Sequence, residues 1–202
     1  AKGRAVVDLS EHWSRDATQP WSDPATYWSE RTAAVSAVDG PVASIDMNAL
    51  SFNAHDLLAR SAGVPIRVAS KSIRVRSVLD AVLALPGYRG ILAFTLDEAI
   101  WLAQDHTDIV LGYPTVSRRA LAQVSADPLL AARITLMIDD LAQLDLIDTI
   151  AAPRQRERLR VAIDVDASWK SRLLGHVGVK RSPLFSSADA QQLARTIVSR
   201  EG

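Results

Sequence analysis

The lysine at position 71 is the side chain of this sequence that is best placed for covalent chemistry. It follows the apolar run of residues 64–70 (VPIRVAS), which is typical of a buried β-strand. Desolvation at the end of such a strand lowers the pKa of an amine, and an unprotonated amine can form a Schiff base. A plain alternative stays open, in which Lys71 is exposed and binds backbone carbonyls or pairs with Asp46.

Other polar side chains also come at the ends of apolar runs. They are Asp46, Thr95, Tyr113, Asp139, Asp164 and Asp166. We predict that Thr95 and Asp139 are helix N-caps, because their oxygens can accept hydrogen bonds from the free N–H groups of a first helical turn. Asp46 could cap a helix in the same way or face the site. Tyr113 is the last residue of its apolar run and carries a hydroxyl group, so we expect it to line the site of Lys71.

Arg67 and the two late aspartates each leave two interpretations open. Arg67 shares a strand face with Lys71 by the two-residue period, so it could bind a ligand or a neighbouring carboxylate. It could equally form a structural ion pair with Asp46 or Asp166. Asp164 and Asp166 do not predict a metal site, because no histidine lies at ligand spacing. We expect one of them to support the site and the other to cap a helix.

A basic segment comes after these aspartates. It contains His176, Lys180 and Arg181 and ends before Pro183. Such a segment could bind an anion such as a carboxylate, or it could be a solvated turn.

Apolar runs that recur along the chain predict the elements that position these residues. The runs, rich in Val, Ile and Leu, cover residues 41–47, 65–69, 90–94, 108–113, 133–138 and 160–164. Unbroken apolar runs that alternate with helical stretches are typical of parallel strands covered on both faces. They fit an open doubly wound sheet or a (β/α)8 TIM barrel. No Gly-rich fingerprint comes after the first run, which disfavours a dinucleotide-binding sheet.

The fold class predicted here is therefore α/β, as the first six β/α units of a TIM-barrel type. Residues 1–40 differ in composition, with Trp13, Trp21 and Trp28 and an Asp23-Pro24 pair that predicts a helix start. We expect an N-terminal helical extension over 1–40 and a partial barrel over 41–202. Because a barrel needs eight strands and about 250 residues, we expect this chain to be the front portion of a larger enzyme.

The composition excludes several classes of protein. The 202 residues include 23 basic and 23 acidic side chains and no cysteine. A balanced charge argues against a nucleic-acid partner, and the lack of cysteine excludes disulfides and a thiol nucleophile. No apolar run approaches the roughly 20 residues that cross a bilayer, and no signal-peptide core is present. We therefore expect a cytoplasmic protein without a membrane partner.

Several segments resemble pyridoxal-phosphate-dependent enzymes with the alanine racemase type of barrel (fold type III). Residues 44–53 (SIDMNALSFN) and 67–71 (RVASK) resemble the opening of these enzymes. Residues 109–114 (IVLGYP) resemble the fourth strand of the D-threonine aldolase and D-serine dehydratase branch. Residues 163–166 (IDVD) and 177–179 (VGV) resemble the sixth strand of that branch and the segment after it. The nearest group is the amino acid deaminase/aldolase group, over residues 41 to 183.

The sequence also departs from that pattern near the lysine. Val68 and Ala69 replace the proline and histidine of the D-threonine aldolase branch. Residues 72–75 (SIRV) replace the Ala-Asn-Ala-Tyr of the racemases, so the tyrosine that contacts the cofactor phosphate there is missing.

The resemblance implies a cofactor, a reaction class and roles for the site residues. Lys71 would hold pyridoxal 5′-phosphate as a Schiff base and act in catalysis, and Tyr113, Arg67, Asp46 and Asp166 would contact the cofactor. The implied reaction is a lyase reaction at Cα of a small D-amino acid, as in the aldolases and deaminases. An alanine racemase-like activity, or a non-catalytic protein that carries the cofactor, is the alternative.

The resemblance also implies parts that the sequence does not contain. Enzymes of this kind have a C-terminal β domain, which in the aldolase branch can bind a divalent metal, and they are homodimers at full length. We therefore expect that this chain alone could lack activity.

Overall fold

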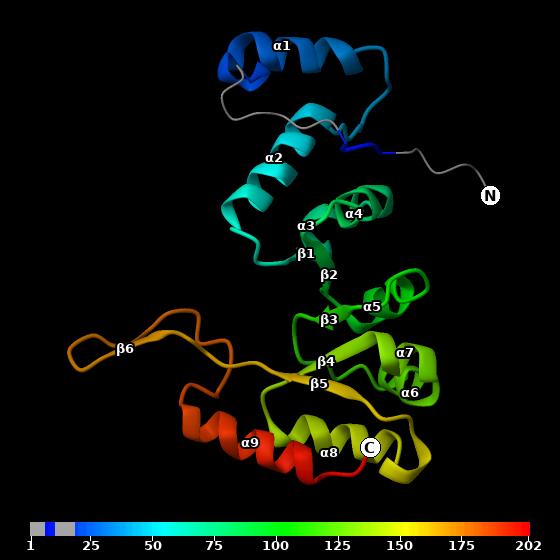
Figure 1. Ribbon diagram of the computed structural model, residues 1–202, viewed down its shortest axis with the longest axis vertical. Coiled ribbons are helices and arrows are strands. Elements are labelled where there is room, and N and C mark those ends of the chain that lie inside the picture. Colours follow the sequence, from blue (N-terminus) through cyan, green and yellow to red (C-terminus); the bar gives the residue numbers. More distant parts are fainter. Residues whose placement is uncertain (1–6, 11–18) are drawn as a thin grey trace. The chain divides into compact units, whose positions relative to one another are not determined.

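The computed structural model describes residues 7–10 and 19–202, and the chain divides into two compact units (Figure 1). The first unit comprises Ala1–Ile66 and Val75–Tyr88, and the second comprises Arg67–Arg74 and Arg89–Gly202. The predicted extension over residues 1–40 falls in the first unit, although Trp13 lies outside the described residues.

The first unit is built from helices. They are the 3₁₀ turn η1 (Pro20–Ser22), α1 (Pro24–Val35), α2 (Met47–Arg60) and α4 (Arg76–Leu83). Asp23 caps α1 as predicted, because its side chain accepts a hydrogen bond from the backbone N–H of Thr26. The Trp21 ring meets the rings of Tyr27 and Phe52 edge-on, with centroids 6.5 and 5.2 Å away. This aromatic cluster packs α1 against α2.

The predicted strand over residues 41–47 is wrong. Met47 begins α2, and the residues before it form no strand. Val42 and Ile45 are each 48% exposed, so this apolar run is not covered as a buried strand would be. The other prediction for the segment is confirmed: Asp46 caps α2, and its Oδ1 accepts hydrogen bonds from the N–H groups of Asn48 and Ala49.

The second unit contains a five-stranded sheet. Its strands are β1 (Ile66–Ala69), β2 (Tyr88–Ala93), β3 (Ile109–Leu111), β4 (Ile134–Ile138) and β5 (Arg160–Ile163), in the order β1-β2-β3-β4-β5. Only Ile66 and Tyr88, the first residues of two strands, belong to the first unit. β3 pairs in parallel with β2 and β4, and β4 pairs in parallel with β5. Five of the six predicted strands are therefore confirmed, and the α/β class is that of a partial TIM-barrel-like unit.

Helices alternate with these strands. They are α3 (Ser70–Ile73), α5 (Leu96–Leu102), α6 (Arg118–Ala126), α7 (Pro128–Arg133), α8 (Leu141–Ile150), the turn η2 (Pro153–Gln155) and α9 (Ser187–Ser199). In Figure 1, α5, α6 and α7 lie along one side of the sheet, where α5 contacts β3 and α7 contacts β4. The core contains fully buried aliphatic side chains, such as Leu102, Ile109 and Leu136. Over the described residues, no helix has both the length and the apolar character that crossing a bilayer requires.

The predicted cap of α5 is confirmed, and that of α8 is wrong by one residue. Thr95 caps α5 through its side-chain oxygen as predicted, and the structure adds a cap of the same kind at Ser186, before α9. Asp140 rather than Asp139 caps α8, in a capping box with Gln143. Asp139 is buried and accepts a hydrogen bond from the Gln143 amide instead. Asp139 therefore helps to hold the capping glutamine in place.

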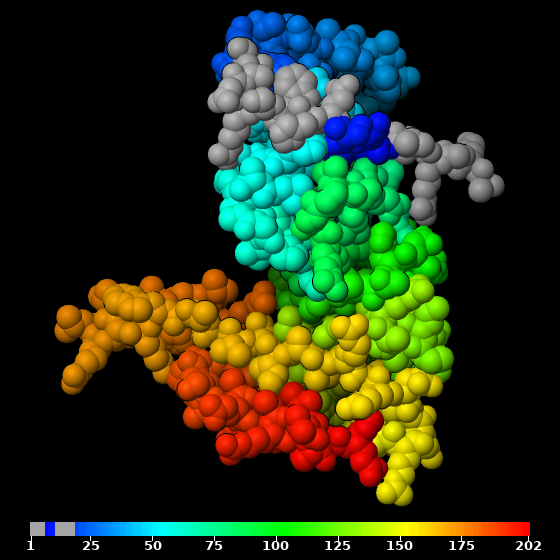
Figure 2. Space-filling view, in the orientation of Figure 1, coloured from blue at the N-terminus to red at the C-terminus, as the bar shows by residue number. Residues whose placement is uncertain are grey.

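A two-stranded antiparallel hairpin comes after β5 and was not predicted. It consists of β6 (Trp169–Ser171) and β7 (Gly175–Val177) and pairs with no other strand. It projects away from the sheet, as the orange segment in Figures 1 and 2 shows. The expectation that Asp164 or Asp166 caps a helix is wrong, because this hairpin takes the place of the helix.

Replacing Asp46 tests the packing of the first unit. Asp46 also accepts a hydrogen bond from the Tyr27 hydroxyl, at 2.8 Å, so Asp46→Ala removes a helix cap and leaves the phenol unpaired. We expect the free energy of unfolding to fall by about 1–2 kcal/mol, measured by urea unfolding followed through tryptophan fluorescence. Asp46→Asn keeps a capping oxygen and should lose less than half as much. Equal losses would show that the cap is unimportant.

Stability should also depend on pH through Asp46. Burial opposes ionisation, but hydrogen bonds from Ala49 and Tyr27 and the charge of Arg31 outweigh it and lower the pKa of Asp46. Asp46 therefore contributes stability above the unfolded value of about 3.9, which is lost as the pH falls through the lower folded pKa. The difference in the free energy of unfolding between the wild type and Asp46→Asn should therefore shrink as the pH falls through that range.

Candidate functional site

Lys71 lies in the short helix α3, directly after β1, and its backbone is held from both sides. The preceding Ser70 is fully buried, and its hydroxyl donates a hydrogen bond to the carbonyl of Leu92 at 3.3 Å. Arg74 ends α3 in the left-handed conformation (φ 53°, ψ 14°), which few non-glycine residues adopt. The Arg74 Nε then donates to the carbonyl of Lys71 at 3.1 Å. The backbone is thus fixed while the amine of Lys71 is exposed.

Tyr113 reaches the same region from the end of β3. The backbone N–H of Gly112 donates to the carbonyl of Ala93 at 2.9 Å, and a Cβ at position 112 would lie only 3.2 Å from that oxygen. Glycine therefore allows the chain to approach β2 closely before Tyr113. The Tyr113 ring stands edge-on to Phe94, with centroids 5.4 Å apart. Tyr113 is in this way fixed against the end of β2.

The prediction that Lys71 and Tyr113 lie together is confirmed. Lys71 Nζ donates a hydrogen bond to the Tyr113 hydroxyl at 3.1 Å and lies 5.5 Å from the ring centroid. The guanidinium of Arg181 lies 4.8 Å from the same centroid. Asp164 holds Arg181 there, because its Oδ2 accepts from Nε at 3.1 Å and from a terminal nitrogen at 3.0 Å. We refer to Lys71, Tyr113 and Arg181 as the lysine cluster.

Two positive charges make the Tyr113 phenol more acidic. The hydrogen bond and charge of Lys71, together with the smaller effect of Arg181, lower the pKa of Tyr113 below its ordinary value. The other two tyrosines differ. The hydrogen bond to Asp46 raises the pKa of Tyr27, and burial raises the pKa of Tyr88. Of the three phenols, Tyr113 gives up its proton most readily.

Arg67 forms an ion pair, but with a different partner from those predicted. Its guanidinium binds the carboxylate of Asp108, with nitrogen–oxygen distances of 3.0 and 3.1 Å. Asp108 directly precedes β3, so Arg67 is engaged toward the amino ends of the strands. The expected pairing with Asp46 or Asp166 is therefore wrong. The two-residue period did not carry over from Arg67 to Lys71, because the strand ends at Ala69 and Lys71 is helical.

The remaining predicted residues are engaged in local contacts. Asp46 belongs to the first unit, where it caps α2. Asp166 accepts hydrogen bonds from the N–H and hydroxyl of Ser168, and its Oδ2 lies 3.1 Å from Nε2 of His176. The Ser168 hydroxyl is the main cause that lowers the pKa of Asp166, and burial opposes it. His176 thus faces Asp166 and does not share an anion site with Arg181.

No metal centre is assembled in the part of the chain that the structure describes. Among those residues, no three His, Cys, Asp or Glu side chains come close enough to hold a metal ion.

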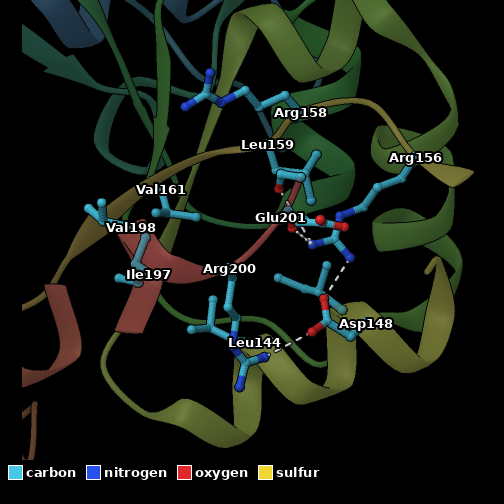
Figure 3. Close-up of a pocket in the computed structure, with 12 residues that line it drawn as sticks. Leu144, Asp148, Arg156, Arg158, Leu159, Val161, Ile197, Val198, Arg200 and Glu201 are labelled. Carbon is cyan, nitrogen blue, oxygen red and sulfur yellow. Dashed lines mark hydrogen bonds and ion pairs between the residues drawn. The ribbon is translucent and has the colours of Figure 1, made fainter. Parts of the chain in front are cut away.

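A cavity of 570 Å³ lies at the opposite end of β5 (Figure 3). Aliphatic side chains line it together with Arg156 and Arg200, which both bind Asp148. It contains none of the predicted site residues, and these two arginines are already paired with Asp148 and, for Arg200, also with Asp145. We therefore place the candidate site at the lysine cluster.

Sequence reasoning missed the contact between Arg181 and Tyr113. Arg181 was expected to act with His176 and Lys180, because those residues are near it in the sequence. No spacing rule could connect it to Tyr113, since an irregular route that includes the hairpin separates Arg181 from its partner Asp164.

Comparison with known proteins gives one family. Residues 45–192 match the alanine racemase N-terminal domain, and this match covers more than half of the chain and includes the whole lysine cluster. No curated protein matches the chain. With its lysine at the end of a strand in an α/β unit of partial-barrel type, the chain belongs to the alanine racemase N-terminal domain family.

Proposed function

We propose that this chain binds pyridoxal 5′-phosphate through Lys71 and takes part in lyase chemistry at Cα of small D-amino acids. The observation that carries the proposal is the contact between the exposed Lys71 amine and the Tyr113 phenol, at 3.1 Å. This contact lies within a match to a family that normally binds this cofactor.

The residues of the lysine cluster fit such a cofactor. Attachment to an aldehyde requires an accessible amine that can lose its proton, and an ion pair with a carboxylate would favour the protonated form. Lys71 meets this requirement, because its side chain is exposed and no carboxylate within the described residues forms an ion pair with it. The Tyr113 ring supplies an aromatic surface, and Arg181 supplies positive charge for an anionic group.

Each member of the lysine cluster has a distinct role in this proposal. Pyridoxal phosphate, when bound, withdraws electrons from Cα of an amino acid and weakens the bonds there. Lys71 Nζ holds the cofactor and, when free, takes up or returns a proton at Cα. The Tyr113 hydroxyl orients Nζ and exchanges a proton with it, which its lowered pKa favours. Arg181, held by Asp164, keeps the phenol ring in place.

The choice of a lyase rests on the resemblance of two segments. Residues 109–114 and 163–166 resemble the D-threonine aldolase and D-serine dehydratase branch, and they contribute Tyr113 and Asp164 to the site. Lys71 and Tyr113 could also support racemisation, because both can carry a proton. The products formed decide between the two reactions.

Reductive trapping tests attachment of the cofactor without any need for turnover. Incubation with pyridoxal phosphate followed by borohydride should add the mass of the reduced cofactor to the peptide that contains Lys71, as seen by mass spectrometry. Lys71→Ala should abolish this label, while Lys180→Ala, at an exposed lysine of the same unit, should keep it. Label on another lysine, or none in the wild type, would remove the basis of the proposal.

Alkaline titration of the tyrosines tests the electrostatics of the lysine cluster. Of the three phenols, Tyr113 should ionise first, because Lys71 and Arg181 lower its pKa. The first step in ultraviolet absorbance should disappear in Tyr113→Phe and remain in Tyr88→Phe. In Lys71→Ala it should shift to higher pH, since the main cause of the lowered pKa is gone. An unshifted first step in Lys71→Ala would contradict the observed hydrogen bond.

Product analysis tests the reaction itself. We expect glycine from D-threonine or a 2-oxo acid from D-serine, with Lys71→Ala slower by about 10²–10⁴-fold or more. Racemisation of alanine without these products would favour a racemase. Trapped cofactor without turnover of any of these amino acids, both by this chain and by a longer one that includes a C-terminal β domain, would contradict the lyase and favour a cofactor-carrying protein.

A further inference from the structure

The cavity shown in Figure 3 has the size and the wall of a small-molecule site. Its volume of 570 Å³ falls within the range of about 300–1,000 Å³ that is common for ligand pockets, which combine an apolar wall with a few polar groups. The wall comes from α8, β5 and α9, which all belong to the second unit. The aliphatic lining residues are Leu144, Ile147, Leu159, Val161, Ile197 and Val198. This wall can cover the apolar body of a ligand.

Arg156 places a buried cation in the lining of this cavity. Its side chain is only 5% exposed, and its Nη1 donates to Asp148 Oδ1 and to the carbonyl of Ala151, both at 2.7 Å. Its Nη2 donates to the backbone carbonyls of Glu201 and Gly202 at 3.4 Å. The Nε of Arg156 is buried as well, but within the described residues it has no hydrogen-bond acceptor. A buried N–H group without an acceptor is unfavourable, so this nitrogen favours an acceptor that enters the cavity.

Arg158 adds a second cation, and no carboxylate of the described chain compensates its charge. Its side chain is exposed, lines the cavity, and forms no hydrogen bond or ion pair with any other described residue. The third arginine of the lining, Arg200, is paired with Asp148. Glu201, which also lines the cavity, is paired with Arg154. Arg158 is therefore available to bind an anion.

These lining residues together select one class of ligand. Three arginines stand against one aspartate and one glutamate, so the cavity has an excess of positive charge and disfavours a cation. A guanidinium group matches the geometry of a carboxylate. An inorganic anion would make no use of the aliphatic wall, and a neutral apolar molecule would offer no acceptor to the arginines. A carboxylate with an aliphatic chain uses both features.

We propose that this cavity is a binding site for a small carboxylate with an aliphatic chain. The carboxylate pairs with Arg158 and accepts a hydrogen bond from Nε of Arg156, while the chain packs against Leu144, Val161 and Ile197. The site is distinct from the lysine cluster, because no residue of that cluster lines the cavity. The proposal therefore does not rest on the cofactor or on the proposed activity.

Isothermal titration calorimetry of the full 202-residue chain tests the site with three probes. Hexanoate should bind with a stoichiometry of one, and raised salt should weaken its binding, because the contact is between charges. Hexanamide has the same chain without the charge, and it should bind about fivefold more weakly or worse. Acetate keeps the charge but lacks most of the chain, so it should bind more than about tenfold more weakly. Equal affinity of hexanoate with either of the other probes would overturn the proposal.

Two variants at exposed lining positions test where hexanoate binds. Arg158→Gln removes the uncompensated cation, and Val198→Asp, at a side chain that is 85% exposed, adds a negative charge. Each should raise the dissociation constant of hexanoate by about two- to fivefold or more. Because both side chains are exposed, the variants should stay folded, which circular dichroism checks.

Matched controls make the result specific to this cavity. Arg118→Gln and Val116→Asp make the same changes at exposed positions of the same unit that do not line the cavity, and they should leave hexanoate binding unchanged. Lys71→Ala should also leave it unchanged, because the lysine cluster lies elsewhere. No saturable binding of hexanoate, binding that Arg158→Gln and Val198→Asp do not weaken, or binding that Lys71→Ala abolishes would each overturn the proposal.

Discussion

The site depends on one hydrogen bond, between Lys71 and Tyr113, whose residues are 42 positions apart in the sequence. Parallel pairing makes it possible, because neighbouring strands then end at the same edge of the sheet. Two small residues lie at the strand ends beside this hydrogen bond. Buried Ser70 ties the start of α3 to β2, and Gly112 lets the end of β3 approach β2 closely. A Cβ at position 112 would meet the Ala93 carbonyl oxygen at 3.2 Å, so the two strands would have to shift by a few tenths of an ångström.

Charge alternates along the chain of contacts that leads to this hydrogen bond. Asp164 holds Arg181, Arg181 lies over the Tyr113 ring, and the phenol accepts from Lys71. Asp164 keeps Arg181 on the ring, so it acts on the phenol through an intermediate residue. The acidity of Tyr113 thus depends on Lys71 and Arg181, which come from opposite ends of this unit in the sequence, and Asp164 contributes only by holding Arg181.

The sequence was sufficient for features that depend on local pattern and insufficient for those that depend on distant partners. Five apolar runs became strands, and Asp23 and Thr95 became caps, because burial and capping depend on neighbouring residues. The run at 41–47 had a similar composition but no neighbouring strand to cover it. Asp108 as the partner of Arg67 could not be predicted, because long-range pairing depends on strand order and register.

The hairpin connects the site to the surface of the second unit. It lies in the segment between Asp164 and Arg181, whose ion pair closes that segment into a loop beside Tyr113. Inside this loop, His176 of β7 contacts Asp166, so the strands of the hairpin are tied to the chain just after β5. The place of Arg181 beside Tyr113 therefore depends on how this loop closes on the chain after β5.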